Sequence, residues 1–329
     1  MGSRFVIPTE PQIPLQNYLL NLVEKSDRKE SSVYLLGVHP FVQEAWNEII
    51  ACKEKTVGWK TIIGKLGIHP QGFYAYKNGK KGISVQMLYQ ILLLWKGYCS
   101  KSEAEFNAKW EKLYQSNFYV SGSRRRQVTL PKAIDPKLAY FAGWICGDGS
   151  FGGYKNHYLV KISEKSVPQL ERVLIPLFQE LFGATPKLHR MYGGGYAINL
   201  NSKPVFRFLK NVLGLKVGVI PTFVDKLDEV NKRYFLAGIF DSEGYVAKKR
   251  YYLTISQAKH NFLLEIQRLL AEVGVVFNGP TTHTTKLGIW YTIYSDKKQE
   301  IRNFSELINS YHVEKSQAIQ TMLIKMQKV

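Results

Sequence analysis

Apolar residues recur at intervals of three and four along residues 16–116, which is the spacing of one face of an α-helix. Within this stretch the pattern predicts a helix over residues 61–68 that ends in a glycine turn. It predicts a second helix over residues 69–77, with Pro70 in the first turn, and a supporting helix from Val85 onward. The first part of the chain is therefore expected to be mainly α-helical.

Beyond Pro131 the pattern changes and repeats itself. Segments 158–163 and 251–256 alternate apolar with more polar residues, as strands with one buried face do. The first copy predicts a helix ending at Gly149, strands at 158–163, a helix at 167–182, strands near 187–191 and 196–201, and a helix from Pro204. The second predicts a helix ending at Gly244, a strand at 251–256, a helix at 261–273, strands near 275–282 and 289–294, and a helix from Lys297. The expected fold class is α+β, with two αββαββα repeats after a mainly helical domain.

The chain carries 45 Lys and Arg against 26 Asp and Glu, a formal charge of +19 that suits a polyanionic partner. Nucleic acid is the leading candidate, because no apolar run reaches the roughly 18 residues of a membrane span. Three isolated cysteines offer neither a disulfide framework nor a zinc spacing, and no signal peptide is evident. An intracellular location is therefore expected.

A polar, basic connector at residues 121–131 is the best domain boundary. Its Arg124, Arg125 and Arg126 either track DNA phosphates or are simply solvated, and the sequence leaves both open. The predicted organisation is a helical domain at 1–120, the basic linker at 121–131, a first repeat at 132–227 and a second at 228–329.

Residues 60–95 resemble a helix-turn-helix of the Cro and repressor kind. In such motifs the second helix enters the major groove, so the resemblance implies that Gln71, Tyr74 and Lys77 face DNA. An ordinary helical hairpin shows the same pattern, and the sequence does not separate the two.

The two repeat-opening helices align position by position: they end FAGWICGDG (residues 141–149) and LAGIFDSEG (residues 236–244). The small residues Ala142, Gly143, Ala237 and Gly238 would let two helix backbones approach closely. Both segments resemble the LAGLIDADG motif. Their 95-residue offset, from Asp148 to Glu243, suits a single-chain, two-repeat member of the LAGLIDADG homing endonuclease family. The resemblance covers residues 132–329.

Close packing of these helices would bring Asp148 and Glu243 together, each just before a glycine able to adopt the left-handed cap conformation. Two carboxylates beside two negative helix ends repel unless a cation is present. The sequence thus predicts a site for Mg²⁺ or Mn²⁺ at these acids, with the preceding Gly147 and Ser242 included. The plainer interpretation is a pair of ordinary helix-end carboxylates.

The resemblance implies phosphodiester hydrolysis, with each acid serving one strand of double-stranded DNA and a break with short 3′ overhangs. It also implies two sheets that form a saddle over the major groove of a long, asymmetric target site. A monomer is expected, since both halves lie on one chain.

Further residues are matched to the family less securely. Glu164 and Gln257, at equivalent strand ends, are expected to help place water, and Lys216 and Lys315 to stabilise charge during attack on phosphate. Ordinary strand-end polarity, and coincidence in a lysine-rich chain, are the alternatives. The sequence departs from the pattern at Cys146, where the second repeat keeps Asp241, which suggests unequal cleavage of the two strands or partial decay.

Strand residues facing DNA should offer basic, amide or hydroxyl side chains to base edges. The candidates are Lys161, Lys187, His189, Asn199 and Asn201 in the first repeat, and Thr254, Thr282, Trp290 and Thr292 in the second. A slip of one residue in strand register would reverse the faces.

The competing class is a non-cleaving binder: a transcription regulator with this fold, or an RNA maturase. Paired carboxylates favour the enzyme, whereas the helix-turn-helix segment suits a regulator. An intein origin is a third idea, but the sequence neither opens with Cys or Ser nor closes with His-Asn. A freestanding or intron-encoded protein is the preferred expectation, with a domain excised from an intein as the remaining one.

Overall fold

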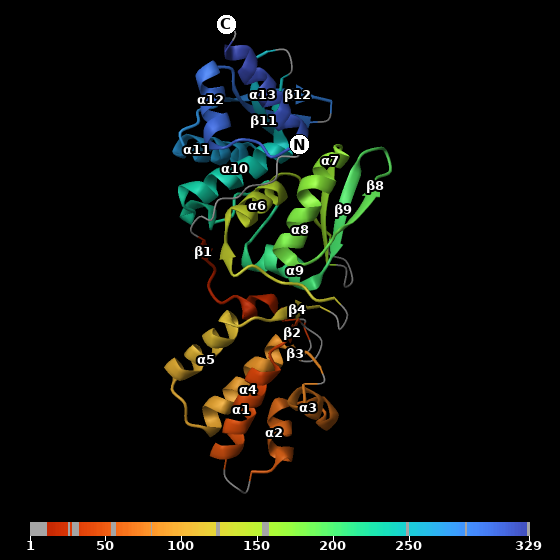
Figure 1. Ribbon diagram of the computed structural model, residues 1–329, viewed down its shortest axis with the longest axis vertical. Helices are drawn as coiled ribbons and strands as arrows, with labels where there is room; N and C mark the ends of the chain where they lie inside the picture. Colours follow the sequence, from red (N-terminus) through yellow and green to blue (C-terminus); the bar gives the residue numbers. More distant parts are fainter. Residues whose placement is uncertain are drawn as a thin grey trace. The chain divides into compact units, whose positions relative to one another are not determined.

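The computed structural model describes residues 12–25, 27, 33–53, 57–79, 81–122, 126–152, 158–247, 250–286 and 288–327. These residues form two compact units (Figure 1). A helical unit comprises Gln16–Leu130 and Ser202–Phe208, and a two-sheet unit comprises residues 12–15, 131–201 and 209 onward. No helix in the described ranges is long and apolar enough to cross a membrane.

Five α-helices account for most of the helical unit: α1 (His39–Cys52), α2 (Trp59–Leu66), α3 (Pro70–Lys77), α4 (Val85–Tyr98) and α5 (Glu103–Gln115). A short 3-10 helix, η1 (Leu19–Leu22), precedes them. The sequence did not predict the small antiparallel sheet of this unit, whose order is β3 (Ile83–Ser84), β2 (Tyr34–Leu36), β4 (Tyr119–Ser121). These strands have two or three residues each, too few for an alternating pattern to be visible.

The two helices predicted at residues 61–77 are present as α2 and α3. Helix α2 ends because Gly67 adopts a left-handed conformation, with φ of 63°. His69 caps α3, since its side chain accepts a hydrogen bond from the Gln71 N–H at 3.3 Å. Leu66 and Phe73 are buried, so both helices pack by their apolar faces.

A buried arginine explains why helix α9 (Lys203–Arg207), which follows the first sheet in sequence, belongs to the helical unit. The Arg207 side chain is fully buried, and its guanidinium donates to the Leu22 carbonyl at 2.9 Å and to the carboxylates of Glu24 and Asp27. A guanidinium can be buried at tolerable cost only when it is paired in this way. The division of the chain therefore differs from a single boundary at residues 120–121.

Two four-stranded antiparallel sheets dominate the second unit, and their strand orders are equivalent. The first has the order β6 (Gly149–Gly152), β7 (Leu159–Glu164), β9 (Tyr196–Asn201), β8 (Lys187–Arg190). The second has the order β10 (Gly244–Val246), β11 (Leu253–Gln257), β13 (Gly288–Ser295), β12 (Asn278–Thr285). The duplication predicted from the sequence is thus present as repeated topology.

The helices of this unit follow the predicted order, but the structure adds a short 3-10 helix at Val224–Lys226 and divides the last predicted helix in two. The opening helices are α6 (Pro136–Asp148) and α10 (Glu229–Glu243). The others are α7 (Val167–Gln169), the π-helix η2 (Leu170–Leu174), α8 (Ile175–Phe182), η3 (Phe208–Val212), η4 (Val224–Lys226), α11 (His260–Glu272), α12 (Lys298–Leu307) and α13 (Val313–Gln327). A break before α13 was not predicted, nor was the pairing of β1 (Ile13–Pro14) with β5 (Ala133–Ile134).

Helices α6 and α10 run side by side and touch through their glycines (Figure 1). A Cβ atom on Gly143 would lie 2.1 Å from the Phe235 carbonyl oxygen, and one on Gly238 would lie 2.1 Å from the Tyr140 carbonyl oxygen. Both distances are far inside van der Waals contact. The prediction that small residues allow close backbone approach is confirmed.

Candidate active site

Asp148 and Glu243 are the last residues of α6 and α10. The glycines after them are not in the predicted left-handed conformation: φ is −69° at Gly149 and −81° at Gly244, where the chain passes straight into strands β6 and β10. They are required for space instead, since a Cβ would lie 2.6 Å from the Ile145 carbonyl oxygen in one case and 2.4 Å from that of Phe240 in the other.

Burial raises the pKa of both carboxyl groups. Burial raises the pKa of Glu243 to about 7, and the negative charge of Asp148 adds to this effect. The pKa of Asp148 is also raised, first by desolvation and then by the charge of Glu164. The arrangement therefore disfavours two negative charges in the absence of a cation.

Gln257 contacts Glu243 directly. Its amide nitrogen donates to the Glu243 carboxylate at 2.8 Å, and its amide oxygen accepts the Ala258 N–H at 2.8 Å. The last residue of β11 is thus fixed beside the second acid, as expected from its place at the strand end.

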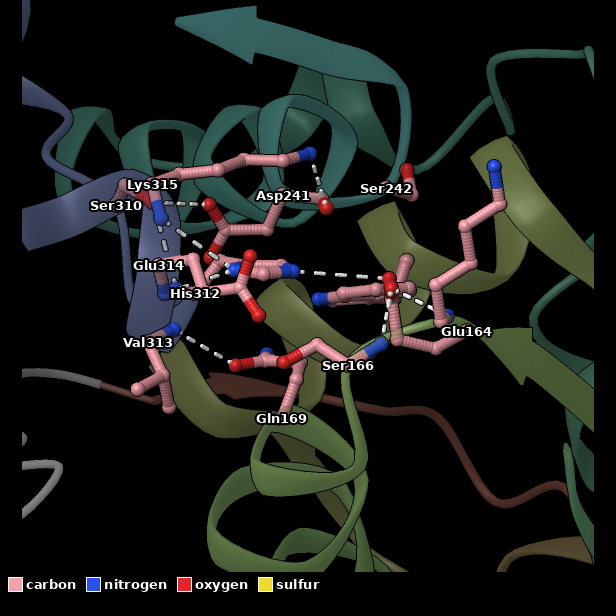
Figure 2. A network of polar contacts seen from close by, with 12 residues as sticks. Glu164, Ser166, Gln169, Asp241, Ser242, Ser310, His312, Val313, Glu314 and Lys315 are labelled. Carbon is pink, nitrogen blue, oxygen red and sulfur yellow. Dashed lines mark hydrogen bonds and ion pairs between the residues drawn. The ribbon is translucent and has the colours of Figure 1, made fainter. Parts of the chain in front are cut away.

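Glu164, at the equivalent end of β7, has different partners (Figure 2). One carboxylate oxygen accepts the backbone N–H groups of Lys165 at 2.6 Å and Ser166 at 2.9 Å, and the other lies 3.6 Å from His312 Nε2. Burial alone would raise the pKa of Glu164, but the contacts with His312 and these N–H groups outweigh it and lower the pKa. Glu164 therefore stays ionised close to Asp148.

Sequence reasoning missed His312. It precedes α13, and its Nδ1 accepts the backbone N–H of Glu314 at 3.2 Å, so the imidazole caps that helix. His312 can reach the site because the chain breaks between α12 and α13, a break that was not predicted; the polar residues Asn309 and Ser310 were a possible sign of it.

Lys315 is close to the predicted acids, whereas Lys216 is exposed. Lys315 Nζ donates to the carbonyl oxygens of Phe240 at 3.1 Å and Asp241 at 2.7 Å, at the end of α10. Burial lowers its pKa, while four carboxylates oppose that effect: Asp241, Glu164, Asp148 and Glu243. Lys216 lies in a turn whose Gly218 N–H donates to the Cys146 carbonyl at 2.7 Å, beside the end of α6.

The aligned positions Cys146 and Asp241 are both fully buried. The Asp241 carboxylate accepts hydrogen bonds from Tyr140 Oη at 2.8 Å, from the Tyr311 N–H at 2.8 Å and from the Ser310 hydroxyl. Burial raises the pKa of the Cys146 thiol to about 12, so it stays neutral. Asp241 holds the segment before α13 against α10, and a thiol at position 146 cannot accept an equivalent set of bonds.

A cleft of about 670 Å³ opens at this end of the two helices. Its lining includes Asp148, Glu164, Ser242, His312 and Lys315. Within the described ranges, no cluster of three or more His, Cys, Asp and Glu side chains has the geometry of a metal site. Two carboxylates with nearby main-chain oxygens do suit Mg²⁺, which usually takes one or two protein carboxylates and completes its shell with water and phosphate oxygens. Gly147 and Ser242 lie together where the helices meet, since a Cβ on Gly147 would be 2.0 Å from Ser242 Oγ.

The five polar residues selected on the first sheet share one face. Lys161 and Lys187 each pair with Asn199 across neighbouring strands. His189 lies two residues after Lys187, and Asn201 two residues after Asn199, so both point to the same face. The buried residues Val160 and Ile162 alternate with Lys161 and occupy the opposite face.

On the second sheet Thr254, Trp290 and Thr292 share the corresponding face, but Thr282 does not. A register shift between Asn278 and Thr281 places Thr281 opposite Thr292, and Thr282 opposite Tyr291 on the other face. The assignment of Thr282 is wrong, because the sequence pattern carries no mark of this irregularity. Thr254 and Thr292 are also largely covered, at 7% and 8% exposed.

In the helical unit Gln71 and Tyr74 are exposed on α3, while Lys77 is half-buried with its ammonium 4.6 Å from the centre of the Trp59 ring. Arg126 is exposed, and its carbonyl oxygen accepts the Ser121 hydroxyl at 2.7 Å. Arg124 and Arg125 lie outside the described residues.

The family model of the LAGLIDADG-like domain matches residues 231–311, which include the second motif, Glu243 and the sheet that follows. The match confirms the family resemblance seen in the second repeat. The first motif lies outside the matched range and is related to the LAGLIDADG-like domain by the equivalent strand order and by the glycine contact with α10.

Two curated proteins of Methanocaldococcus jannaschii are similar to the chain. One is a glutamine–fructose-6-phosphate aminotransferase [isomerizing], 28% identical over 271 residues, which covers 78% of this chain and 24% of that protein. The other is a reverse gyrase, 27% identical over 217 residues, which covers 64% of this chain and 12% of that protein. The chain thus spans about a quarter or less of the length of these relatives.

Solved structures similar to part of this chain include I-DmoI in complex with DNA and Ca, with 23% identity over 56% of this chain and 97% of that one, at a TM-score of 0.43. Full-length DUF199/WhiA from Thermatoga maritima is 18% identical over 57% of this chain and 60% of that one, at a TM-score of 0.39.

Proposed function

We propose that this chain is a site-specific endonuclease that hydrolyses one phosphodiester bond on each strand of a long, asymmetric DNA duplex, with Mg²⁺ or Mn²⁺. The observation that carries the proposal is the pair Asp148 and Glu243 at the adjoining ends of α6 and α10. Burial, together with the negative charge of Asp148, raises the pKa of Glu243 to about 7, an energetic cost that a bound divalent cation would reverse. A protein that only binds DNA gains nothing from that cost.

Asp148 and Glu243 would hold the cation, with Gly147 and Ser242 next to it. A divalent ion held there would supply Lewis-acid activation of water and charge neutralisation at the leaving oxygen. The amide of Gln257 fixes Glu243, and Glu164 offers a charged acceptor that can orient a water near Asp148. The Lys315 ammonium supplies positive charge where phosphate oxygens would enter the cleft.

The proposed DNA surface is the polar face of each sheet, formed as a saddle over the major groove by residues such as Lys161, Lys187 and Asn199. The formal charge of +19 supports binding to phosphates along a long site. Helix α3 would add a contact in a neighbouring major groove through Gln71 and Tyr74. Because one chain carries both acids, we propose that it acts as a monomer.

The test is cleavage of a randomised duplex library with Mg²⁺ by the unaltered chain, Asp148→Asn and Glu243→Gln. The expected result is a double-strand cut at one long sequence, reduced to a nick or abolished by either change. Ca²⁺ in place of Mg²⁺ should preserve binding while stopping cleavage. Cutting that survives the double substitution would mean that the acids are not the catalytic pair.

The second candidate is a non-cleaving DNA-binding regulator or an RNA maturase, favoured by the helix-turn-helix geometry of α2 and α3. Sequence-specific binding with no cutting, under every divalent cation, would support it over the endonuclease.

The names of the two M. jannaschii relatives describe unrelated activities, and the chain covers a minor part of each. We therefore propose that the shared segment is an inserted element that occurs in different host proteins, rather than part of an aminotransferase or a gyrase. This raises the intein origin above the freestanding or intron-encoded alternative.

A further inference from the structure

The segment between α12 and α13 belongs to the second repeat but docks on the first (Figure 2). The Val313 N–H donates to the side-chain oxygen of Gln169 at 3.0 Å, and the Tyr311 ring meets the Tyr140 ring edge to face, with 5.4 Å between the ring centroids. These contacts carry His312 to the strand end of the first sheet.

The hydrogen bonds of His312 determine which nitrogen of its ring carries the proton. Its Nδ1 accepts the N–H groups of Glu314 at 3.2 Å and Lys315 at 3.4 Å, so Nδ1 carries no proton. The ring proton is therefore on Nε2, which lies 3.6 Å from the Glu164 carboxylate. The side chain is only 4% exposed, so little water competes for this contact.

The second half of the site has no equivalent of this arrangement among the aligned residues. His312 stands three residues before Lys315, and the residue three positions before the other candidate lysine, Lys216, is Leu213, which is apolar and buried. The counterpart of Glu164 is Gln257, which binds Glu243 through its own amide. Glu164 thus has an imidazole from the other repeat beside it, whereas Glu243 is bound by Gln257 of its own repeat.

We propose that His312 is a positioning residue that holds Glu164 beside Asp148, so that it serves only the DNA strand cut at the Asp148 half of the site. This inference rests on the proposed endonuclease function. It assigns a role to a residue of the second repeat in the chemistry of the first, and it makes the two strand cleavages separable by one substitution.

The test uses His312→Asn, because asparagine keeps the helix cap but is too short to reach Glu164. His69→Asn is the matched control: His69 caps α3 through the same kind of bond, to the Gln71 N–H, and lies in the helical unit. A duplex recovered from the library is labelled with a different dye on each strand, and single-turnover cleavage is followed on both. Asp148→Asn identifies which strand the Asp148 half cuts.

His312→Asn should slow cleavage of that strand by about ten-fold or more, which is the usual effect of losing a partner that orients a metal-site residue. The rate of cleavage of the other strand and the affinity for DNA in Ca²⁺ should both stay unchanged. His69→Asn should leave the ratio of the two cleavage rates unchanged. Equal slowing of both strands, or no slowing, would overturn the proposal. Absence of cleavage by the unaltered chain would overturn the endonuclease function and the strand assignment with it.

The contact itself has a readout that needs no cleavage. In protein labelled with ¹⁵N-histidine, the His312 ring, identified by its loss in His312→Asn, should show the proton on Nε2. The Nε2 signal should move in Glu164→Gln more than the Nδ1 signal does. A proton on Nδ1, or a spectrum unchanged by Glu164→Gln, would refute the contact whether or not the chain cuts DNA.

Discussion

Asp241 sits at the position where the first repeat has Cys146, and its role is structural. It is fully buried, and burial raises its pKa, while Lys315 and the hydrogen bonds from Ser310 and Tyr140 oppose that rise. A buried carboxylate with three donors is stable only while all three remain. The acid at this position therefore anchors the segment that carries His312 and Lys315.

Asp241→Asn should lower the free energy of unfolding by about 2–4 kcal/mol, because an amide cannot accept from all three donors and leaves buried groups unpaired. Urea unfolding followed by tryptophan fluorescence measures the change. The exposed Asp296→Asn makes the same chemical substitution and should shift stability by less than about 0.5 kcal/mol. An equal effect of the two would mean that the buried network contributes nothing.

Glu243 should make the protein less stable as pH rises. Its pKa is about 7 in the fold against an ordinary 4.5, so between these values the unfolded chain loses the proton while the folded chain keeps it. Without divalent cations, Glu243→Gln should therefore raise the free energy of unfolding at pH 8 by up to about 3 kcal/mol, measured as a higher melting temperature. At pH 4 it should leave the melting temperature unchanged.

The exposed Glu306→Gln is the control for loss of one negative charge. Mg²⁺ should stabilise the unaltered chain at pH 8 and have a smaller effect on Glu243→Gln. The interpretation fails if Glu243→Gln gives the same gain at pH 4 as at pH 8, since ionisation could not then be its source.

At the scale of elements, the pairing of α6 with α10 depends on two glycines. Gly143→Ala or Gly238→Ala would place a methyl group about 2 Å from a backbone carbonyl that no side-chain rotation can move. Each should lower stability by about 3 kcal/mol or more and separate the acids, abolishing cleavage.

Gly64→Ala in α2 is the matched control. It lies in a helix with nothing within 4 Å of the added Cβ, and should stabilise its unit by about 0.5–1 kcal/mol. If Gly143→Ala behaved like Gly64→Ala in thermal unfolding, the helices would not be in close contact.

Strand faces show where element-scale prediction succeeds and where it stops. Alternation placed Lys161, Lys187 and Asn199 on one face because β7, β8 and β9 pair without interruption. It failed for Thr282 because a register shift in β12 adds one residue that the partner strand lacks. A local irregularity of pairing is a property of two strands together, and neither strand's sequence reveals it.

For the whole molecule, the proposed contact of α3 with DNA predicts a measurable loss of affinity. The double change Gln71→Ala and Tyr74→Ala should weaken binding in Ca²⁺ by about ten-fold, if each contact contributes around 0.7 kcal/mol, and shorten the DNase I footprint at one end. The salt dependence should not change, because neither residue is charged, whereas Lys161→Ala should reduce the slope of log K against log salt by about one. The exposed Ile50→Ala on α1 is the control, and a full-length footprint for the double variant would assign α3 a packing role alone.

The sequence by itself determined the duplicated order of elements, the presence of helices α2 and α3, and the position of Asp148 and Glu243 at equivalent helix ends. These follow from local periodicity and from a motif that occurs twice, both of which are written in consecutive residues. The tertiary structure decided the rest: the extended glycines after the acids, the face of Thr282, the anchoring role of Asp241 and the presence of His312 beside Glu164. Each of these depends on segments far apart in sequence being packed together, so that burial and hydrogen-bond partners, rather than residue type, set what a side chain does.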